Sequence, residues 1–366
     1  MSLVDHHHCA TCTCSPTGER TTVSYLGWAN RGNMGDDAIR HALQAVLPQL
    51  ELIPLPLTMR GFSQLATDRS RRRVRNTHLL LGGGTTIGRR NWRVPLLANL
   101  TVTGRRPLLM VGAGVEDPSF QGRHSFSAGG ELKRWVPVLR EFDRVTVRGP
   151  RSARLLADVG VEATVVGDPA LLLGAPLAEM EPGLLGVNLG YGSDLWSHSQ
   201  ITVLKEVAPA LRRLHRAGWR FRFLVANLED AQWTRFCVAL AQLPPGSFEE
   251  VVAVRPEVFL EAVAPCHLVL GQRLHAVILA AAAGVPSVML EYQPKCRDLM
   301  ESLGAKERSF RTDRLQADVL FRALEDLGDH RARAAVELAG RVEEYRVRLR
   351  AEIDRVATVV AAGQPA

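Results

Sequence analysis

Short apolar runs and amphipathic segments alternate along most of the chain. In the first half the apolar runs have the length of buried strands, and they lie at residues 22–26, 50–54, 78–81, 107–111, 144–147 and 163–166. Between them, residues 35–47, 130–140 and 150–159 carry apolar side chains at helical spacing. Buried strands that alternate with helices predict a mostly parallel sheet covered on both faces.

The same alternation starts again after residues 174–183, which are rich in Gly and Pro and are typical of a linker. The expected strands of this second set are 185–188, 220–225, 251–253, 267–270 and 287–290, and the expected helices are 201–217, 228–242 and 256–263. Residues after 313 follow a helical pattern to about 360, and we expect this long tail to cross back onto the first domain.

A chain of 366 residues is longer than one typical core, which favours two domains. We predict a disordered tail over 1–20, a Rossmann-like domain over 21–175, a second Rossmann-like domain over 183–312 and C-terminal helices over 313–366. The two α/β domains are expected to face a common cleft.

The composition changes this picture little. The chain is 46% hydrophobic and 23% charged, as soluble globular proteins are. No apolar run approaches the length of a membrane-spanning helix, and the first residues lack the apolar core of a signal peptide. These features predict a cytoplasmic protein.

Positive charge exceeds negative charge, with a formal net charge of +7. The basic residues are scattered except in residues 69–75, where Arg dominates. A solvated helix end or loop is the favoured interpretation, and a contact with membrane lipid phosphates or with an anionic acceptor is the alternative. No nucleic-acid motif accompanies this stretch, so we expect no nucleic-acid partner.

The chain contains six cysteines, of which three are isolated and are expected to be reduced thiols: Cys237, Cys266 and Cys296. The other three, Cys9, Cys12 and Cys14, follow a run of His at 6–8 in a spacing that suits zinc. Because this segment is short and lacks a second pair of ligands, a disordered tail is favoured over a zinc site. We expect no metal centre in the folded part.

The strongest chemical signal is an Arg and a His at a strand-to-helix junction. Arg273 and His275 follow the apolar strand at 267–270 and precede the apolar run at 276–284. Ligands bind at this edge of open α/β sheets, and a helix N-terminus favours anions. The Arg fork grips carboxylate or phosphate, and His moves protons near neutral pH. The junction therefore predicts a small, strongly anionic ligand that reacts.

This junction and four other segments, taken in order, resemble the polysaccharide pyruvyl transferase family. The segments are residues 25–39 (YLGWANRGNMGDDAI), 79–85 (LLLGGGT), 145–161, 167–170 (GDPA) and 271–295. Any one glycine loop is weak evidence, whereas the ordered set is strong. Two positions depart from the family pattern, which has Asp where Gly149 stands and often has Glu where Asp37 stands.

The resemblance implies a GT-B-like fold and an enzyme that joins the pyruvyl group of phosphoenolpyruvate to two hydroxyls of one sugar as a cyclic ketal. The expected acceptor is a sugar or lipid-linked oligosaccharide of a cell-surface or exopolysaccharide precursor. No cofactor is expected, since phosphoenolpyruvate is a co-substrate. A GT-B glycosyltransferase that uses a nucleotide sugar, and a non-catalytic anion- or sugar-binding protein, remain alternatives.

The resemblance also implies a donor site. Phosphoenolpyruvate carries a carboxylate and a phosphate, and the candidates that would bind it are Arg148, Arg273, Leu274, His275 and Lys295. Leu274 would contribute its backbone N–H at the helix start. A structural ion pair is the alternative for Arg148 and Arg273, and a packed side chain is the alternative for His275. Lys295 is expected in a loop near the same sheet edge, where facing the acceptor is its alternative role.

Catalysis is assigned to His275, as general acid/base or phosphate contact, and to Asp36, as acceptor of a proton from the sugar hydroxyl. The acceptor-binding candidates are Asn30, Asn33, Asp37, Gly83, Gly84 and Glu291. Structural roles are the alternatives, since Asp36 and Asp37 also suit a helix N-terminus and Glu291 suits a surface or interdomain hydrogen bond. We interpret Asp168 as a turn cap. The residue that protonates the donor methylene carbon is not assigned.

Overall fold

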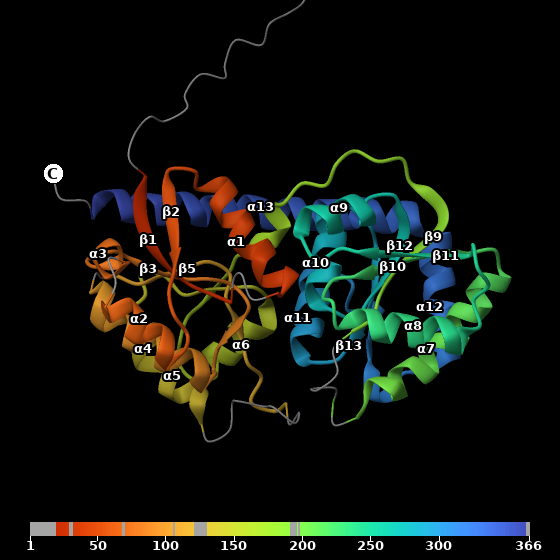
Figure 1. Ribbon diagram of the computed structural model, residues 1–366, viewed down its shortest axis with the longest axis horizontal. Helices are drawn as coiled ribbons and strands as arrows, with labels where there is room; N and C mark the ends of the chain where they lie inside the picture. Colours follow the sequence, from red (N-terminus) through yellow and green to blue (C-terminus); the bar gives the residue numbers. More distant parts are fainter. Residues whose placement is uncertain are drawn as a thin grey trace, which may run out of the picture.

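Two parallel sheets form the framework of the protein, one in each half of the chain (Figure 1). The computed structural model describes residues 20–28, 32–67, 70–104, 107–120, 130–190, 196 and 198–363. The Cys and His residues near the start of the chain, and with them the zinc alternative, lie outside the described residues.

The first sheet has the strand order β2-β1-β3-β5, and all its strands are parallel. These strands are β1 (Thr21–Leu26), β2 (Leu50–Pro54), β3 (Leu79–Leu81) and β5 (Leu109–Met110). Further short parallel pairs are β4 (Thr85–Ile87) with β6 (Gly114–Val115) and β7 (Thr146–Val147) with β8 (Thr164–Val165). Two isolated parallel bridges, between Leu108 and Phe142 and between Ala113 and Val147, connect the β5 side to the β7 side.

The second sheet has the order β11-β10-β9-β12-β13-β14 and is parallel throughout. Its strands are β9 (Glu181–Asn188), β10 (Arg220–Val225), β11 (Phe248–Val252), β12 (Cys266–Gly271), β13 (Ser287–Glu291) and β14 (Ser309–Arg311). In β12, Leu268, Val269 and Leu270 are fully buried. A strand that is covered on both faces carries apolar side chains at successive positions. The length of the apolar run in the sequence therefore indicated these strands better than an alternation of apolar and polar residues would have.

Helices cover both faces of the sheets. Those of the first half are α1 (Met34–Val46), α2 (Met59–Thr67), α3 (Ser70–Val74), α4 (Arg90–Thr103), α5 (Glu131–Leu139), α6 (Pro150–Ala157) and the 3₁₀ turn η1 (Pro169–Leu172). Those of the second half are α7 (Gln200–Arg216), α8 (Asp230–Ala241), α9 (Pro256–Val263), α10 (Leu274–Ala282), α11 (Pro294–Ser302), η2 (Lys306–Arg308), η3 (Thr312–Arg314), α12 (Ala317–Asp329) and α13 (Arg331–Ala362). Helix α10 is apolar on all sides because it packs against α1, α9, η1 and α13 at the centre of the molecule.

Helix α13 runs from the second half back along the first half, as expected for the C-terminal tail (Figure 1). Its Arg346 side chain donates hydrogen bonds to the backbone carbonyls of Leu171, Leu173 and Ala282. Tyr345 packs against Gly167, where a Cβ atom would lie 2.9 Å from the tyrosine ring. The helix therefore contacts both halves along its length.

Three sequence predictions are wrong in detail. Residues 181–183 belong to β9 and not to the linker, because Glu181 pairs with Cys266 at the start of β12. Pro294 and Lys295 open α11 instead of forming a loop, since Pro suits the first position of a helix. Helices α2, α3 and α4 were not predicted, and α4 carries Pro95 in its interior, which obscures its helical pattern.

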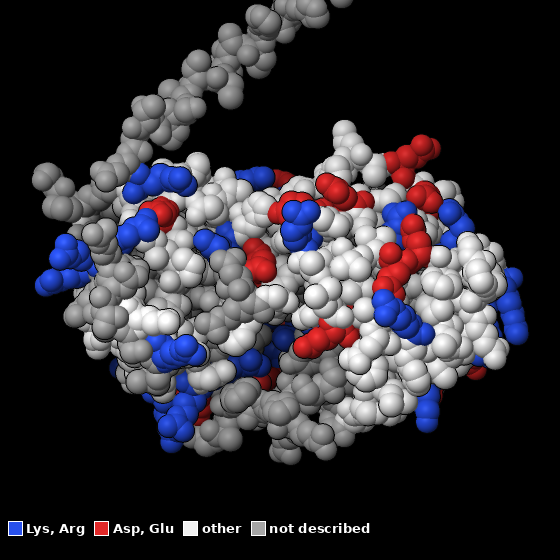
Figure 2. Space-filling model, in the orientation of Figure 1, with Lys and Arg blue, Asp and Glu red and all other residues white. Residues whose placement is uncertain are grey.

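The arginine-rich residues 69–75 include α3, and exposed basic side chains gather at this end of the molecule (Figure 2). Arg72, Arg73 and Arg75 are exposed there, and Arg73 donates a hydrogen bond of 2.6 Å to Glu51. Among the described residues, no helix has both the length and the apolar character needed to span a bilayer.

The three isolated cysteines are free and buried, which confirms the prediction of reduced thiols. Burial raises the pKa of Cys237, Cys266 and Cys296 to about 12 in each case. They are therefore protonated and unreactive near neutral pH.

Gly149 and Asp298 join the two halves at the start of α6. Asp298 accepts a hydrogen bond of 2.8 Å from the Arg151 amide and one of 2.6 Å from the Ser152 hydroxyl. A Cβ atom on residue 149 would lie 2.2 Å from Asp298 Oδ1, so only Gly leaves room for this carboxylate. The family pattern has Asp at position 149, and here α11 places a carboxylate at the same helix start, where it is favoured.

Gly149→Asp should destabilise the protein, and adding Asp298→Gly should restore part of the loss. The single change places two carboxylates in one buried site, which we expect to lower the free energy of unfolding by about 2–4 kcal/mol. The double variant keeps one carboxylate at the helix start and should recover at least about half of that loss. Urea unfolding of the full chain measures both.

Arg154→Ala is the matched control, because Arg154 and Glu301 form an exposed ion pair, of 2.9 Å, between the same two helices. Its effect should stay within about 1 kcal/mol. A double variant no more stable than Gly149→Asp alone would contradict the compensation between residues 149 and 298.

Candidate functional site

A cavity of about 420 Å³ lies between the two halves of the molecule. Its lining comes from segments that follow β1, β3, β7, β12 and β13, the edge at which α/β sheets bind ligands. Basic side chains are visible in the recess between the halves (Figure 2). Eight of the residues predicted from the sequence line this cavity: Asn33, Asp36, Gly84, Arg148, Arg273, Leu274, His275 and Lys295.

Four predicted acceptor residues are not among the described lining. Asn30 lies outside the described residues. Asp37 belongs to the first turn of α1 but does not line the cavity. Gly83 lies beneath α1, where a Cβ atom would be 2.8 Å from Ile39 Cδ1, so packing explains its lack of a side chain.

Glu291, the fourth of these residues, ends β13 and is buried away from the cavity. Its carboxylate accepts a hydrogen bond of 3.1 Å from Ser309 and lies 3.3 Å from Arg297. Burial raises the pKa of Glu291, although the nearby Arg297 opposes this shift. Glu291 therefore has a structural role, but its hydrogen bond is buried within the second half and is neither the surface nor the interdomain bond expected as the alternative.

The N-termini of α1 and α10 meet at the cavity. Arg273 is the N-cap of α10, and Leu274 and His275 form its first turn, as predicted. The His275 ring packs directly on Gly35, where a Cβ atom would lie 2.0 Å from His275 Nδ1. Glycine at position 35 is therefore required for His275 to reach the cavity. Both helix starts direct free N–H groups toward this region, which favours an anion.

Behind His275 lies the fully buried carboxylate of Asp168. Asp168 Oδ2 is 3.7 Å from His275 Nε2 and 3.5 Å from Arg148 Nη1. Its other oxygen accepts a hydrogen bond of 3.0 Å from the Ala170 amide and caps η1. Burial by itself raises the pKa of Asp168, but His275, Arg148 and the Ala170 amide outweigh it and lower the pKa. The turn-cap interpretation is confirmed, and the contact with His275 and Arg148 is additional.

Several buried N–H groups at this point have no hydrogen-bond partner. They are Nε and Nη1 of Arg148 and Nε2 of His275. Leaving such groups without a partner is costly, and native proteins seldom do so except where a ligand or solvent completes the site. Arg148 is also almost fully buried, at 2% exposure. Arg148 Nη1 and His275 Nε2 lie 3.5 Å and 3.7 Å from the Asp168 carboxylate, so these groups form a loosely paired buried cluster, and Arg148 and His275 both line the cavity.

Asp36 occupies the first turn of α1 beside the glycine loop. The Asn33 side chain caps the helix and donates a hydrogen bond of 2.5 Å to Asp36 Oδ2. Gly84 has a φ of +88°, and a Cβ atom there would lie 3.1 Å from Asp36 Oδ1. Burial raises the pKa of Asp36, and the charges of His275 and Lys295 only partly offset this effect. A carboxyl group with a raised pKa is suited to exchange protons near neutral pH.

Arg273 forms the structural ion pair that was its alternative role. Its Nε and Nη2 atoms each lie 2.6 Å from the carboxylate of Asp230, which is fully buried. The Arg273 side chain keeps 15% of its surface exposed and lines the cavity. Two of its donors are thus engaged within the protein. Arg148 also pairs with a buried carboxylate, that of Asp168, but at 3.5 Å the contact is looser, so Arg148 is the stronger candidate for a direct anion contact.

Lys295 lies in the first turn of α11 and faces the cavity. Burial, followed by the charges of Arg89 and Arg148, lowers its pKa to about 8. Its Nζ atom lies 5.0 Å from the centre of the Tyr292 ring. The positive charges of Arg89, Arg148 and Lys295 repel one another in this partly buried cavity. An anionic ligand would relieve that repulsion.

Sequence reasoning missed several residues of this cavity. Arg89 is the N-cap of α4, and its Nε atom donates a hydrogen bond of 2.7 Å to Glu116. Trp28, Trp92 and Asn91 also line the cavity. Trp28 lies in residues 25–39, one of the segments that resemble the family, so the sequence held a signal for it. Residues 89–92 carry no pattern that indicates a site.

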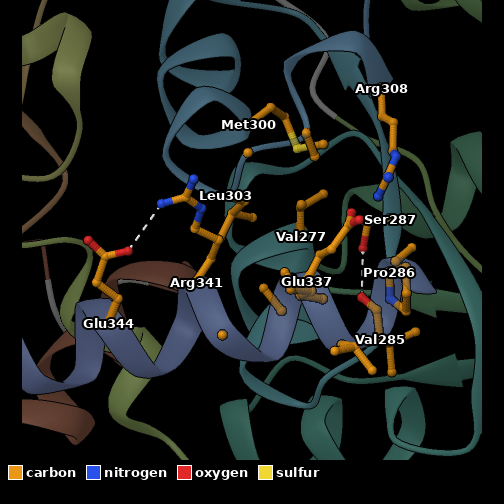
Figure 3. A pocket seen from close by; sticks show the side chains of 17 residues that line it. Val277, Val285, Pro286, Ser287, Met300, Leu303, Arg308, Glu337, Arg341 and Glu344 are labelled. Carbon is orange, nitrogen blue, oxygen red and sulfur yellow. Dashed lines mark hydrogen bonds and ion pairs between the residues drawn. The ribbon is translucent and has the colours of Figure 1, made fainter. Parts of the chain in front are cut away.

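A second cavity, of about 490 Å³, lies between α13 and the segments around α10 and α11 (Figure 3). Arg341 reaches over it but pairs with Glu344 at 3.1 Å, and the Ser287 hydroxyl donates to the Val285 carbonyl at 3.2 Å. Arg341 and Ser287 are thus engaged within the protein. The chemistry predicted from the sequence gathers in the smaller cavity.

Comparison with known families identifies the chain at this point. The sequence model of the polysaccharide pyruvyl transferase family matches residues 33–294, most of the chain and nearly all of the cavity lining. The protein belongs to the polysaccharide pyruvyl transferase family. This confirms the predicted family, and no curated protein has a significantly similar sequence.

Solved structures similar to this pyruvyl transferase family member share its fold at low sequence identity. UDP-GlcNAc 2-epimerase of Methanocaldococcus jannaschii has a TM-score of 0.52 and 12% identity over 85% of this chain and 93% of its own. An Anabaena protein in complex with UDP and glucose has a TM-score of 0.53 and 12% identity over 94% and 100%. UDP-GlcNAc 2-epimerase of Neisseria meningitidis has a TM-score of 0.51 and 8% identity over 90% and 99%. These similarities confirm the predicted GT-B-like α/β fold with its C-terminal helices.

Proposed function

We propose that the protein transfers the pyruvyl group of phosphoenolpyruvate to two hydroxyls of one sugar and forms a cyclic ketal. The observation that carries the proposal is the group of cations Arg148, His275 and Lys295 beside the carboxyl of Asp36 in one cavity. Phosphoenolpyruvate holds a carboxylate and a phosphate on a three-carbon skeleton, so its site needs several cations close together. Membership of the pyruvyl transferase family supports the same reaction.

Donor binding is assigned first to Arg148. Its buried Nε and Nη1 groups have no hydrogen-bond partner, and a phosphate or carboxylate oxygen would satisfy them. The start of α10 adds the backbone N–H of Leu274, and Lys295 adds a positive charge. Because Arg273 is held by Asp230, we assign it a charge contribution at the wall of the cavity.

The reaction needs one proton on the donor methylene carbon and removes one from each sugar hydroxyl. We assign the transfer of the proton to the methylene carbon to Asp36, whose carboxyl group lines the cavity and whose pKa is raised by burial. Asp36 protonates the methylene carbon and then takes the proton of the first hydroxyl as that oxygen bonds to the central carbon. The bond from this carbon to the phosphate oxygen breaks with assistance from His275. The second hydroxyl then closes the ketal, and its proton leaves with the phosphate.

Asp168 acts through His275 in this scheme. Its carboxylate is buried behind the imidazole and cannot touch the donor while His275 and Arg148 cover it. A carboxylate in this position orients the ring that assists phosphate departure. Asp168 is therefore a positioning residue.

Titration of phosphoenolpyruvate by calorimetry tests the donor assignment, and Arg148→Gln is the informative variant. The change removes charge-assisted hydrogen bonds, so we expect donor binding to weaken by about 2–3 kcal/mol. That loss is roughly a 30- to 150-fold increase in Kd. Arg154→Gln, an exposed position on α6, should leave the affinity unchanged.

UDP and GDP are titrated into the same preparations. Binding of a nucleotide without binding of phosphoenolpyruvate would overturn the proposed function in favour of glycosyl transfer. Unchanged donor affinity in a folded Arg148→Gln protein would exclude Arg148 from the donor site.

Asp168→Asn separates the positioning role of Asp168 from its structural one. An Asn side chain can still accept the hydrogen bond from Ala170 but carries no charge for His275 and Arg148. We expect kcat for phosphate release to fall by about tenfold or more, measured on folded protein well below the urea transition. The urea midpoint should fall as well, because the change leaves the buried Arg148 without its counter-charge. His275→Ala should cause a similar loss, and the double variant should lose little more, because the two residues act as one unit. Independent, multiplying losses would contradict the proposed link.

Donor affinity should fall as pH rises through about 8, the pKa to which Lys295 is lowered. Below this pH the side chain is a cation and attracts the donor, and above it the side chain is neutral. The donor phosphate loses its last proton near pH 6, so its charge is constant over the window from about 7 to 9.5. Lys295→Arg keeps its charge throughout and should remove this dependence, as calorimetry at several pH values would show. An unchanged slope in Lys295→Arg would exclude Lys295 as its origin.

A further inference from the structure

The cavity has an aromatic wall that the donor chemistry does not use. Trp28 follows β1, and Trp92 lies in the first turn of α4, and both line the cavity. Their ring centres are 6.4 Å apart with an interplanar angle of 60°, an edge-to-face arrangement. Phosphoenolpyruvate is small and carries two anionic groups, so it has little apolar surface to match two indole rings.

Trp28 is unusually exposed for its size. It leaves 39% of its surface accessible, whereas Trp92 beneath it leaves 7%. An indole ring buries a large apolar area when it packs inside a protein. An indole ring that stays exposed in a cavity therefore indicates a surface on which a ligand packs. The buried edge of Trp92 supports the ring of Trp28 and limits its freedom, so less entropy would be lost when a ligand binds.

The polar groups around this wall suit a molecule with many hydroxyls. Asn91 precedes Trp92 in the lining, and Asn33 lies beside Asp36 at the start of α1. A pyranose ring presents a face of C–H groups and a rim of hydroxyls, which matches an indole face in a cavity that also holds amide and carboxyl side chains. Nucleobases also stack on indoles, but the amides of Asn33 and Asn91 and the carboxyl of Asp36 in the same lining fit hydroxyl chemistry.

We infer that Trp28, supported by Trp92, forms the binding wall for the acceptor, and that the acceptor presents a pyranose ring with its C–H face on Trp28. The inference rests on the proposed function, since it places the acceptor next to Asp36 and leaves the cationic residues to the donor. A cavity of about 420 Å³ is within the range that holds a drug-sized ligand, which is sufficient for a sugar ring and a three-carbon donor together.

Ligand-observed NMR with the full-length protein tests this directly. The probes are the methyl β-pyranosides of glucose, galactose and mannose, which carry no aromatic group of their own, and the acyclic polyol sorbitol, which lacks a flat C–H face. At least one pyranoside should receive saturation at its ring C–H protons, and sorbitol should not. Binding of no pyranoside, or equal binding of sorbitol, overturns the inference.

The variants are Trp28→Ala and Trp28→Phe, and the control is Phe236→Ala. Phe236 lies in α8, outside the cavity lining, and its exposed fraction of 41% is similar to that of Trp28. Trp28→Ala should raise the pyranoside Kd by about tenfold or more, and Trp28→Phe by about threefold or less, because Phe keeps an aromatic face. Phe236→Ala should change nothing. Unchanged pyranoside affinity in Trp28→Ala, or UDP binding that this variant abolishes, overturns the inference.

Phosphoenolpyruvate titration of the same variants separates the two proposals. Donor affinity should be equal in all of them within about threefold, because Trp28 contacts only the acceptor. Loss of donor binding with Trp28→Ala would overturn the division of the cavity into two walls. If the wild-type protein binds pyranosides through Trp28 but not phosphoenolpyruvate, the sugar wall stands and the proposed donor fails.

Discussion

The buried carboxylate of Asp168 is the contact on which the cationic side of the cavity depends. It lies between His275 of the second half and Arg148 of the first, and it also caps η1. Without a negative charge here, a buried guanidinium and an imidazole would face each other with no compensation. The carboxylate therefore allows two halves of the molecule to direct basic groups into one small space.

Asp168 and Asp36 show how one site can hold two carboxyl groups in different states. Burial affects both, but Asp168 has two basic neighbours and a backbone amide, which lower its pKa, whereas the pKa of Asp36 remains raised. Groups whose surroundings shift their pKa values apart are suited to separate acid–base roles. The imidazole of His275 lies 3.7 Å from Asp168, which precedes η1, and its charge also acts on Asp36 at the start of α1.

The fold alone does not select the chemistry. Enzymes whose structures contain UDP have the same two-half architecture at 12% identity, so function must be argued from the residues in the cavity. A carboxylate that the family pattern places at one position can also be supplied by a residue of another helix. Gly149 lacks the carboxylate of the pattern, and Asp298 of α11 supplies one at the same helix start.

Much of the fold and part of the site were determined by the sequence itself, because buried parallel strands, glycine turns and helix starts leave local patterns. Arg148, Asp36 and His275 could be placed at strand ends and helix starts from those patterns alone. Only the tertiary structure decided that Asp230 engages Arg273 and that Trp28 meets Trp92. Such partners are far apart in the chain, and their contacts depend on how the two halves pack, which no local spacing of residues specifies.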